Sequence, residues 1–215
     1  MLIDPQNRAT PFLRALDAAA EHFFEGVVSI SGGACLNMTA VTLELARRFK
    51  VKAAPLSVSF EARNAAYEDF VARFGRAPTT TDNVEGAWAV IGGCAKPKVE
   101  NGAWQGHLVA ILDGRWIVDL SIGQAYRPER GIHMPSVLVG PVSNKFLRGE
   151  ERASTSNDVG ATLHYAAVLG DRSYLNLPGF QLHDRNRATA DTIEGMMRRL
   201  LEHGSGESSV CFRSA

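Results

Sequence analysis

The stretch at residues 29–39 constrains this chain more than any other, because it forces a sharp turn directly before a helix. Two consecutive glycines, Gly32 and Gly33, reach backbone angles that other residues resist, so a tight turn costs little there. A helical pattern of apolar residues follows over about residues 34–49. Its first turn contains Cys35. The sequence therefore predicts a cysteine at the N-terminus of a helix.

The expected helix has one polar face and one inward-facing stripe. Its polar face carries Asn37, Glu44 and Arg48. The stripe consists of Cys35, Met38, Thr42, Leu45 and Phe49. We therefore expect the thiol of Cys35 to point toward the protein interior.

A second informative stretch, residues 105–120, is expected to form a β-hairpin around the turn pair Asp113-Gly114. The first strand, at 105–112, contains His107, and the second, at 115–120, contains Asp119. Successive side chains in a strand point to opposite faces of the sheet. The length of the loop therefore decides whether the imidazole and the carboxylate share a face.

Two loop lengths are compatible with this turn pair. In a two-residue loop, His107 and Asp119 face opposite sides of the sheet. In a three-residue loop at 112–114, Ile111 pairs with Arg115. His107 then lies directly opposite Asp119, with their Cβ atoms ~5 Å apart. We predict the three-residue loop, and we expect the Cys35 helix to pack on the apolar residues of that face, which are Val109, Ile111 and Ile117.

The chemical requirements of a nucleophilic cysteine are met by Cys35 together with His107 and Asp119. A cysteine attacks as the thiolate, and an ordinary thiol with a pKa of ~8.5 is only a few per cent ionised near neutrality. A helix N-terminus and a nearby imidazolium both favour the thiolate. Backbone N–H groups of the same helical turn suit a developing oxyanion. We interpret Cys35 as nucleophile, His107 as base and Asp119 as the group that orients the imidazole.

Each of these three residues also has an ordinary structural interpretation. A buried cysteine packs as a small hydrophobic residue. A histidine on a strand is often a hydrogen-bonded core residue, and an aspartate at a strand end is often a turn or cap residue. Their joint occurrence, in the order Cys, His, Asp with the last two on one hairpin, favours catalysis.

The segments that carry this constellation resemble the transglutaminase-like, papain-like superfamily. Gly32-Gly33-Ala34-Cys35 with LELARRF and KVKAAPLSV is similar to its nucleophile helix and following strand, and GHLVAILDGRWIVDLSIG to its His hairpin and Asp strand. Within the superfamily the likeness is greatest to arylamine N-acetyltransferases, and it covers about residues 29–60 and 104–142. The resemblance implies that Cys35 is the nucleophile, His107 the general base and then acid, and Asp119 the orienting carboxylate.

Composition restricts the possible partners. Lys+Arg and Asp+Glu both number 23 among 215 residues, so no basic field is available for nucleic acid. The three cysteines contain no CxxC pattern, which disfavours a disulfide framework or a structural zinc site and favours a reducing compartment. The N-terminus lacks a signal-peptide pattern, and no apolar run approaches the ~20 residues of a membrane span. We expect a cytoplasmic protein with no membrane partner; the oligomeric state stays open.

The rest of the chain predicts an α+β fold, because helices and mostly antiparallel strands do not alternate regularly. We expect a single papain-like domain at 1–204 and a flexible tail at 205–215. Polar loops are expected at 75–86 and, as a mobile connection, at 143–160. The expected further helices are 11–24, 65–74 and 189–203, and the expected further strands are 51–60, 88–91, 137–142 and 161–169.

Several other residues are weighed as site candidates. For substrate binding we select Trp104, Gln105 and Ser31, and as weak oxyanion donors Ser29, Ser31 and Gln105. Trp88 is assigned to core packing, Cys94 to a loop or structural thiol, and Cys211 to the tail. The remaining histidines have no metal-ligand spacing such as HExxH; they are His22, His133, His164, His183 and His203.

The leading hypothesis is a cysteine-dependent acyl-transfer enzyme that cleaves an amide, ester or thioester through a thioacyl-enzyme, resolved by water or an amine. It would act on a small molecule or a peptide, without a cofactor or a metal, and acyl-CoA is considered as a co-substrate. A catalytically inactive papain-like module that binds a peptide or protein is the alternative. A toxin-like effector enzyme with the same chemistry is a third.

Overall fold

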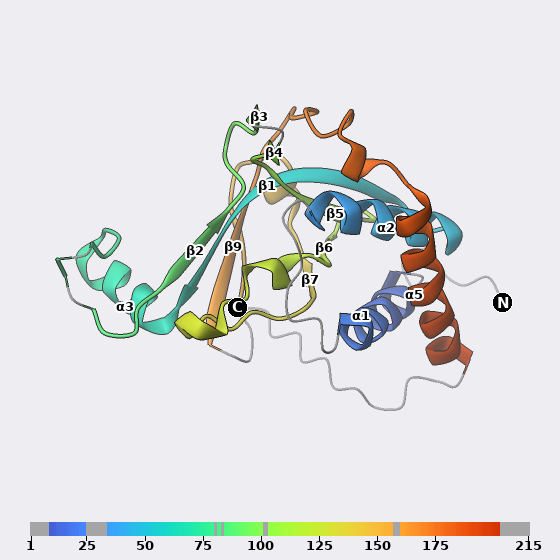
Figure 1. Ribbon diagram of the computed structural model, residues 1–215. Coiled ribbons are helices and arrows are strands. Elements are labelled where there is room, and N and C mark those ends of the chain that lie inside the picture. Colours follow the sequence, from blue (N-terminus) through green and yellow to red (C-terminus); the bar gives the residue numbers. More distant parts are fainter. Residues whose placement is uncertain are drawn as a thin grey trace.

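The computed structural model describes residues 9–24, 34–79, 81–82, 84–100, 103–156 and 160–202. This part of the chain has an α+β architecture, in which helices cover part of a strongly curved, mostly antiparallel sheet (Figure 1). The α-helices are α1 (Ala9–Phe24), α2 (Ala34–Arg48), α3 (Ala65–Phe74), α4 (Asn144–Leu147) and α5 (Asp184–Glu202). The strands are β1 (Ala53–Asn64), β2 (Ala89–Gly92), β3 (Val99–Glu100), β4 (Ala103–Trp104), β5 (His107–Leu112), β6 (Trp116–Asp119), β7 (Leu138–Pro141), β8 (Ala153–Ser156) and β9 (Ala161–Ala167).

The main sheet has the strand order β7-β6-β5-β1-β9-β8, and β2 also pairs with β1. One edge of β1 is shared by two strands placed end to end: residues 53–58 pair with β5, and residues 60–63 pair with β2. We call the place where Gly92 ends β2 and His107 begins β5 the β2–β5 junction. The chain between these two residues leaves the main sheet and forms the small β3–β4 hairpin.

The two faces of the sheet are buried by different parts of the chain. The face that carries Ala110, Leu112 and Val118 packs against α1, α2 and α5. The opposite face, which we call the inner face, is covered by the segments around the 3₁₀ turn η2 (Ile122–Ala125) and α4. Its buried residues include Val58, Phe60, Val109, Ile111, Ile117, Leu163 and Tyr165. The prediction that Val109, Ile111 and Ile117 contact the Cys35 helix is therefore wrong, because α2 packs on the other side of β5.

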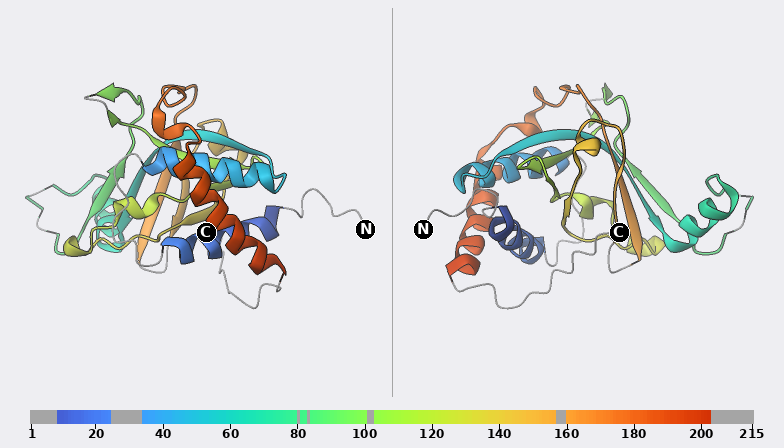
Figure 2. Two further views of the ribbon diagram at one scale, coloured as in Figure 1. Left: turned by 45° about the vertical axis from the view of Figure 1, so that its right-hand side comes forward. Right: turned by 180° about the vertical axis from the view of Figure 1, so that it is seen from behind.

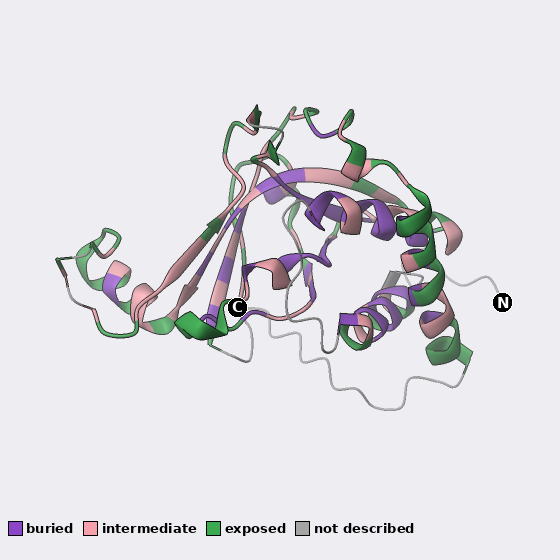
Figure 3. Ribbon diagram, in the orientation of Figure 1, coloured by how far each residue is buried: buried purple, intermediate pink, exposed green. Residues whose placement is uncertain are grey.

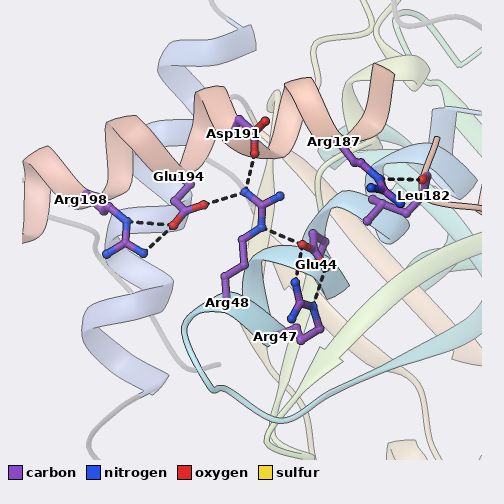
Figure 4. Close-up of polar contacts among 8 residues, drawn as sticks. All are labelled: Glu44, Arg47, Arg48, Leu182, Arg187, Asp191, Glu194 and Arg198. Atoms are coloured by element: carbon purple, nitrogen blue, oxygen red, sulfur yellow. Dashed lines mark hydrogen bonds and ion pairs between the residues drawn. The ribbon is translucent and has the colours of Figure 1, made fainter. Parts of the chain in front are cut away.

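The helices α1, α2 and α5 lie together at one end of the molecule, whereas α3 lies at the far end of β1 (Figure 2). Figure 3 shows that α1, α2 and α5 carry buried residues, and many of these form one core cluster with residues of the sheet. An ion-pair network joins α2 to α5: Arg48 binds Glu44 on its own helix, and Asp191 and Glu194 on α5, at 2.6–2.7 Å (Figure 4). This network, which we call the Arg48 network, fixes the helix that carries Cys35.

The hairpin between β5 and β6 has a register that was not predicted. Leu112 pairs with Trp116 and Ile111 with Ile117, so the loop consists of residues 113–115 and the predicted pairing of Ile111 with Arg115 is wrong. Asp113 and Gly114 both have positive φ, and the N–H of Arg115 donates to the carbonyl of Leu112. Asp113 and Gly114 thus form a tight turn in the left-handed backbone region. Arg115 is the third residue of the loop, and β6 begins after it.

The loop has three residues, as predicted, but it lies one residue further along the chain, at 113–115 instead of 112–114. Every cross-strand pairing therefore shifts by two residues, and a shift of two keeps every side chain on its face. His107 and Asp119 consequently still share the inner face, as diagonal neighbours instead of a directly opposed pair.

Other predictions met mixed outcomes. The helix at 65–74 is confirmed, and Gly75 ends it in a left-handed conformation with φ of 66°. Residues 143–160 are not merely a polar connection, because they include α4 and β8. The last helix begins at Asp184, five residues before the predicted start. The Gly32-Gly33 turn and the tail at 205–215 lie outside the described residues. In the described part of the chain, no helix combines the length and apolarity needed to cross a bilayer.

Candidate active site

Cys35 occupies the first turn of α2, as predicted, and its side chain is 4% exposed. It packs in a small cluster with Leu36, Leu108 and Tyr174. One turn further along the helix, the hydroxyl of Thr39 donates to the carbonyl of Leu108 at 2.9 Å. This buried bond ties the beginning of α2 to the beginning of β5. The thiol is thereby held next to the first residue of that strand, which is His107.

His107 and Asp119 are in direct contact. Nε2 of the imidazole lies 2.7 Å from Oδ2 of the carboxylate, and both side chains are buried. The second ring nitrogen, Nδ1, is therefore free of Asp119, and Cys35 lies near enough to the imidazole to contribute to the raised pKa of His107. The side chains form a chain in the order Cys35, His107, Asp119. The structure thus brings together the three residues selected from the sequence.

Cys35 and His107 approach from opposite sides of the sheet. The helix that carries Cys35 covers one face, whereas the imidazole of His107 belongs to the inner face and stacks edge-on against Phe60 at 4.7 Å between ring centroids. They meet because His107 is the first residue of β5, at the β2–β5 junction. The interruption of the sheet at this junction gives the thiol access to the inner face.

Asp119 is fully buried, and the surrounding groups supply all of its hydrogen bonds. Oδ1 accepts from the N–H and the hydroxyl of Ser121, at 2.9 and 2.7 Å. Oδ2 accepts from His107 and from the hydroxyl of Tyr165, the latter at 3.0 Å. Burial alone would raise the pKa of Asp119, but the charge on His107 and the bonds from His107 and Ser121 lower it below its usual value. Asp119 is therefore ionised and held in one orientation.

The Asp119 carboxylate in turn shifts the pKa values of the two ring-bearing side chains that bond to it, His107 and Tyr165. Burial alone would lower the pKa of His107, but the charge and hydrogen bond of Asp119, together with Cys35, outweigh burial and raise it from 6.5 to about 10. Burial, followed by the charge of Asp119, raises the pKa of Tyr165 well above its ordinary value. Tyr165 therefore remains a hydrogen-bond donor, and His107 is an imidazolium near neutral pH.

Gly93 forms the other wall of the β2–β5 junction. Its φ is +70°, and an added Cβ would lie 2.5 Å from the carbonyl oxygen of Val58 and 2.9 Å from the backbone nitrogen of His107. Both contacts are far shorter than van der Waals distance, so a side chain does not fit. Gly93 thus allows the backbone of β2 to pass directly beside His107.

A cavity of about 660 Å³ opens at this junction and contains the Cys35–His107 pair in its wall. Its size is that of a small-molecule or peptide side-chain site. Apolar groups from several parts of the chain line it, among them Leu36, Phe60, Val90, Ile91, Trp104 and Leu177. Polar lining is contributed by Asn37, Gln105, Gln124 and Arg127.

Two of the three predicted substrate-binding residues, Trp104 and Gln105, line this cavity. The indole N–H of Trp104 donates to Ser173, which orients the ring, and the side-chain amide of Gln105 donates to Glu100. One N–H of the Gln105 amide is thus taken by Glu100, and the second N–H remains for another acceptor. Ser29 and Ser31, also considered for that role, lie outside the described residues.

The residues that were set aside lie elsewhere. Cys94 is partly buried two residues beyond the end of β2, and Trp88 packs against the inner-face core. His164 bridges Ser154 and Glu68, at 2.8 and 2.6 Å. Cys211 and His203 lie outside the described residues. Within those residues, no three side chains of His, Cys, Asp or Glu gather as metal ligands would.

Four residues of the site were missed from the sequence. Ser121 had a local signal, because a serine two residues after an aspartate commonly bonds its carboxylate. Gly93 follows another glycine, but nothing in the sequence indicates which part of the backbone it approaches. Tyr165 is 46 residues from Asp119 and has no local signal. Arg127 likewise reaches the cavity only through the path of the chain after β6.

Comparison with protein-family models, with curated proteins and with solved structures gave no match to this chain. The chemistry of the site must therefore be argued from its geometry.

Proposed function

We propose that this protein is a cysteine-dependent acyl-transfer enzyme with a papain-like, transglutaminase-like core. The observation that carries the proposal is the buried His107–Asp119 hydrogen bond beside Cys35, with Cys35 and His107 in the wall of one cavity. Nucleophile, base and orienting group in mutual contact are the signature of nucleophilic catalysis.

In the proposed reaction, the Cys35 thiolate attacks the carbonyl carbon of an amide, ester or thioester. The carbonyl oxygen becomes an oxyanion, for which the backbone N–H groups of the first turn of α2 are suitable donors. Nδ1 of the His107 imidazolium then protonates the leaving amine, alcohol or thiol. The product of this half-reaction is an acyl group on the sulfur of Cys35.

The second half-reaction releases the acyl group. Neutral His107 takes a proton from a water molecule or an amine, which attacks the thioester carbon and expels the Cys35 thiolate. Asp119 keeps Nε2 of the imidazole occupied in both steps, so that Nδ1 always faces the sulfur. Whether the products are those of hydrolysis or transfer depends on which acceptor enters the cavity.

The proposal is tested by mass spectrometry of the intact protein after incubation with acyl-CoAs and with 4-nitrophenyl esters. We expect one acyl adduct, located at Cys35 by peptide mapping and absent from the Cys35→Ala variant. His107→Ala should slow its formation by about 10²–10⁴-fold, because general acid–base catalysis contributes that much. Cys94→Ala is the matched control and should acylate as the wild type does.

If no donor acylates Cys35, or if Cys94 acylates equally fast, the acyl-transfer function is wrong. That result would favour the alternative, a catalytically inactive module that uses the same cavity to bind a peptide or a protein.

A further inference from the structure

Arg127 stands out among the groups that line the active-site cavity. It is the one residue with a permanent charge among the described residues of the lining, where the other polar side chains besides Cys35 and His107 are the neutral amides of Asn37, Gln105 and Gln124. The other cation of the lining, the His107 imidazolium, already has Asp119 as its buried counter-charge, whereas the Arg127 side chain is exposed and open to an anionic substrate.

The guanidinium of Arg127 has no carboxylate partner among the described residues. Its Nη1 donates to two backbone carbonyls, those of Gln124 at 2.7 Å and Tyr126 at 2.6 Å. The nearest carboxylate along the sequence, Glu129, pairs instead with Arg130 at 4.0 Å. The positive charge of Arg127 is therefore not neutralised by an acidic side chain in the described structure.

The backbone and the guanidinium of Arg127 are both held in place. Its N–H and carbonyl pair with those of Ile132 at 3.0 Å, in a bridge closed by the 3₁₀ turn η3 (Pro128–Arg130). The two carbonyls that bind Nη1 anchor the side chain against η2. Nε and Nη2 have no acceptor among the described residues. A guanidinium edge with two free donors matches the two oxygens of a carboxylate.

We propose that Arg127 is the specificity residue of the active site, and that it selects substrates with a carboxylate a few atoms away from the carbonyl that Cys35 attacks. The inference rests on the proposed acyl-transfer function. Arg127 takes no part in the chemical steps; it binds the carboxylate and thereby places the reacting carbonyl at the sulfur. The apolar lining, with Val90, Trp104 and Leu177, would contact the intervening part of the substrate.

The test uses alkylating reagents, so that it does not depend on a known substrate. N-iodoacetyl derivatives of glycine, β-alanine and γ-aminobutyrate carry a carboxylate at three distances from the reactive carbon. The corresponding primary amides are neutral and nearly isosteric. The rate of Cys35 alkylation by each reagent is measured by mass spectrometry, and Cys94 in the same molecule is the internal reference. The variants are Arg127→Gln, Arg127→Lys and the matched control Arg130→Gln, which changes an exposed arginine outside the cavity lining.

In the wild type, we expect at least one acid to alkylate Cys35 about tenfold faster than its amide, after normalisation to Cys94. Arg127→Gln should abolish this preference, Arg127→Lys should keep part of it, and Arg130→Gln should keep all of it. The spacer with the largest preference reports how far the carboxylate site lies from the sulfur.

Two negative results can be told apart. If Cys35 reacts faster than Cys94 but the acid-to-amide ratio is the same in wild type and Arg127→Gln, the role of Arg127 is wrong and the acyl-transfer function stands. If Cys35 reacts no faster than Cys94 with the neutral amides, the activated thiol itself is absent, and both proposals fail.

Discussion

At the scale of single residues, the site depends on how completely the hydrogen-bonding capacity of the Asp119 carboxylate is filled. A buried carboxylate without partners would take up a proton, and it would then no longer stabilise an imidazolium. Here Ser121 and Tyr165 supply three of its hydrogen bonds and His107 the fourth. Because Ser121 and Tyr165 approach from different segments, the carboxylate stays fixed when the proton on His107 moves.

Gly93 provides a test at the same scale. Gly93→Ala should destabilise the protein by about 2–4 kcal/mol, because the new methyl group meets the backbone of Val58 and His107 and the left-handed φ is strained. It should also slow the acylation of Cys35, since relief of the clash displaces His107. Both effects are measured by chemical denaturation and by the rate of adduct formation.

Gly86→Ala is the matched control for this substitution. Gly86 has nearly the same φ, +69°, but an added Cβ would meet nothing within 4 Å. The cost should be about 1 kcal/mol, without a change in the acylation rate. Equal effects of the two substitutions would show that close packing at Gly93 does not position His107.

At the scale of elements, α2 is held by more than its apolar stripe. The side chain of Arg48 bonds to Glu44, Asp191 and Glu194 and is 19% exposed. The side chain of Arg47, one position earlier, is 72% exposed and has Glu44 as its one partner among the described residues. Exposed pairs contribute little because solvent screens them, but a shielded network that joins two helices contributes more.

We therefore predict different costs for two neighbouring substitutions. Arg48→Ala should lower the free energy of unfolding by about 1–3 kcal/mol, because three carboxylates lose their shared cation. Arg47→Ala should change it by less than about 0.5 kcal/mol. Chemical denaturation of both variants measures the difference, and equal values would contradict a role for the Arg48 network in fixing α2.

The elements differ in how well the sequence predicts them. The helices containing Cys35 and Phe70 were predicted nearly to their ends, because apolar spacing and glycine stops act locally. The register of the hairpin was not predicted, because whether Arg115 belongs to the loop or to the strand depends on its pairing with β5, and no local pattern determines that pairing. The shared face of His107 and Asp119 was nevertheless correct, since the error was an even number of residues.

At the scale of the whole molecule, the site exists because β1 has two partners on one edge. The interruption between them brings a helix from one side of the sheet into contact with a histidine on the other. No local sequence pattern predicts this arrangement, because β2 and β5 are separated along the chain by the β3–β4 hairpin, which lies outside the main sheet. For the same reason, the sequence pointed to Cys35, His107 and Asp119 but not to Gly93, Tyr165 and Arg127.

The central claim is that His107 activates Cys35, and the rate of Cys35 alkylation tests it most directly. Although burial alone would lower it, Asp119 raises the pKa of His107 to about 10, so the imidazolium is present near neutral pH. A nearby imidazolium is one of the devices by which proteins activate a cysteine. An ordinary thiol is almost entirely protonated at pH 6. The measurement is alkylation by iodoacetamide at pH 6, resolved by residue with peptide mass spectrometry.

In the wild type, Cys35 should react at least about tenfold faster than Cys94 or Cys211. His107→Ala should bring its rate down to theirs, and Asp119→Asn should reduce it part of the way, because the imidazolium loses its buried counter-charge. If Cys35 reacts no faster than the other two cysteines, and His107→Ala leaves its rate unchanged, Cys35 is a packing residue and the acyl-transfer function is wrong.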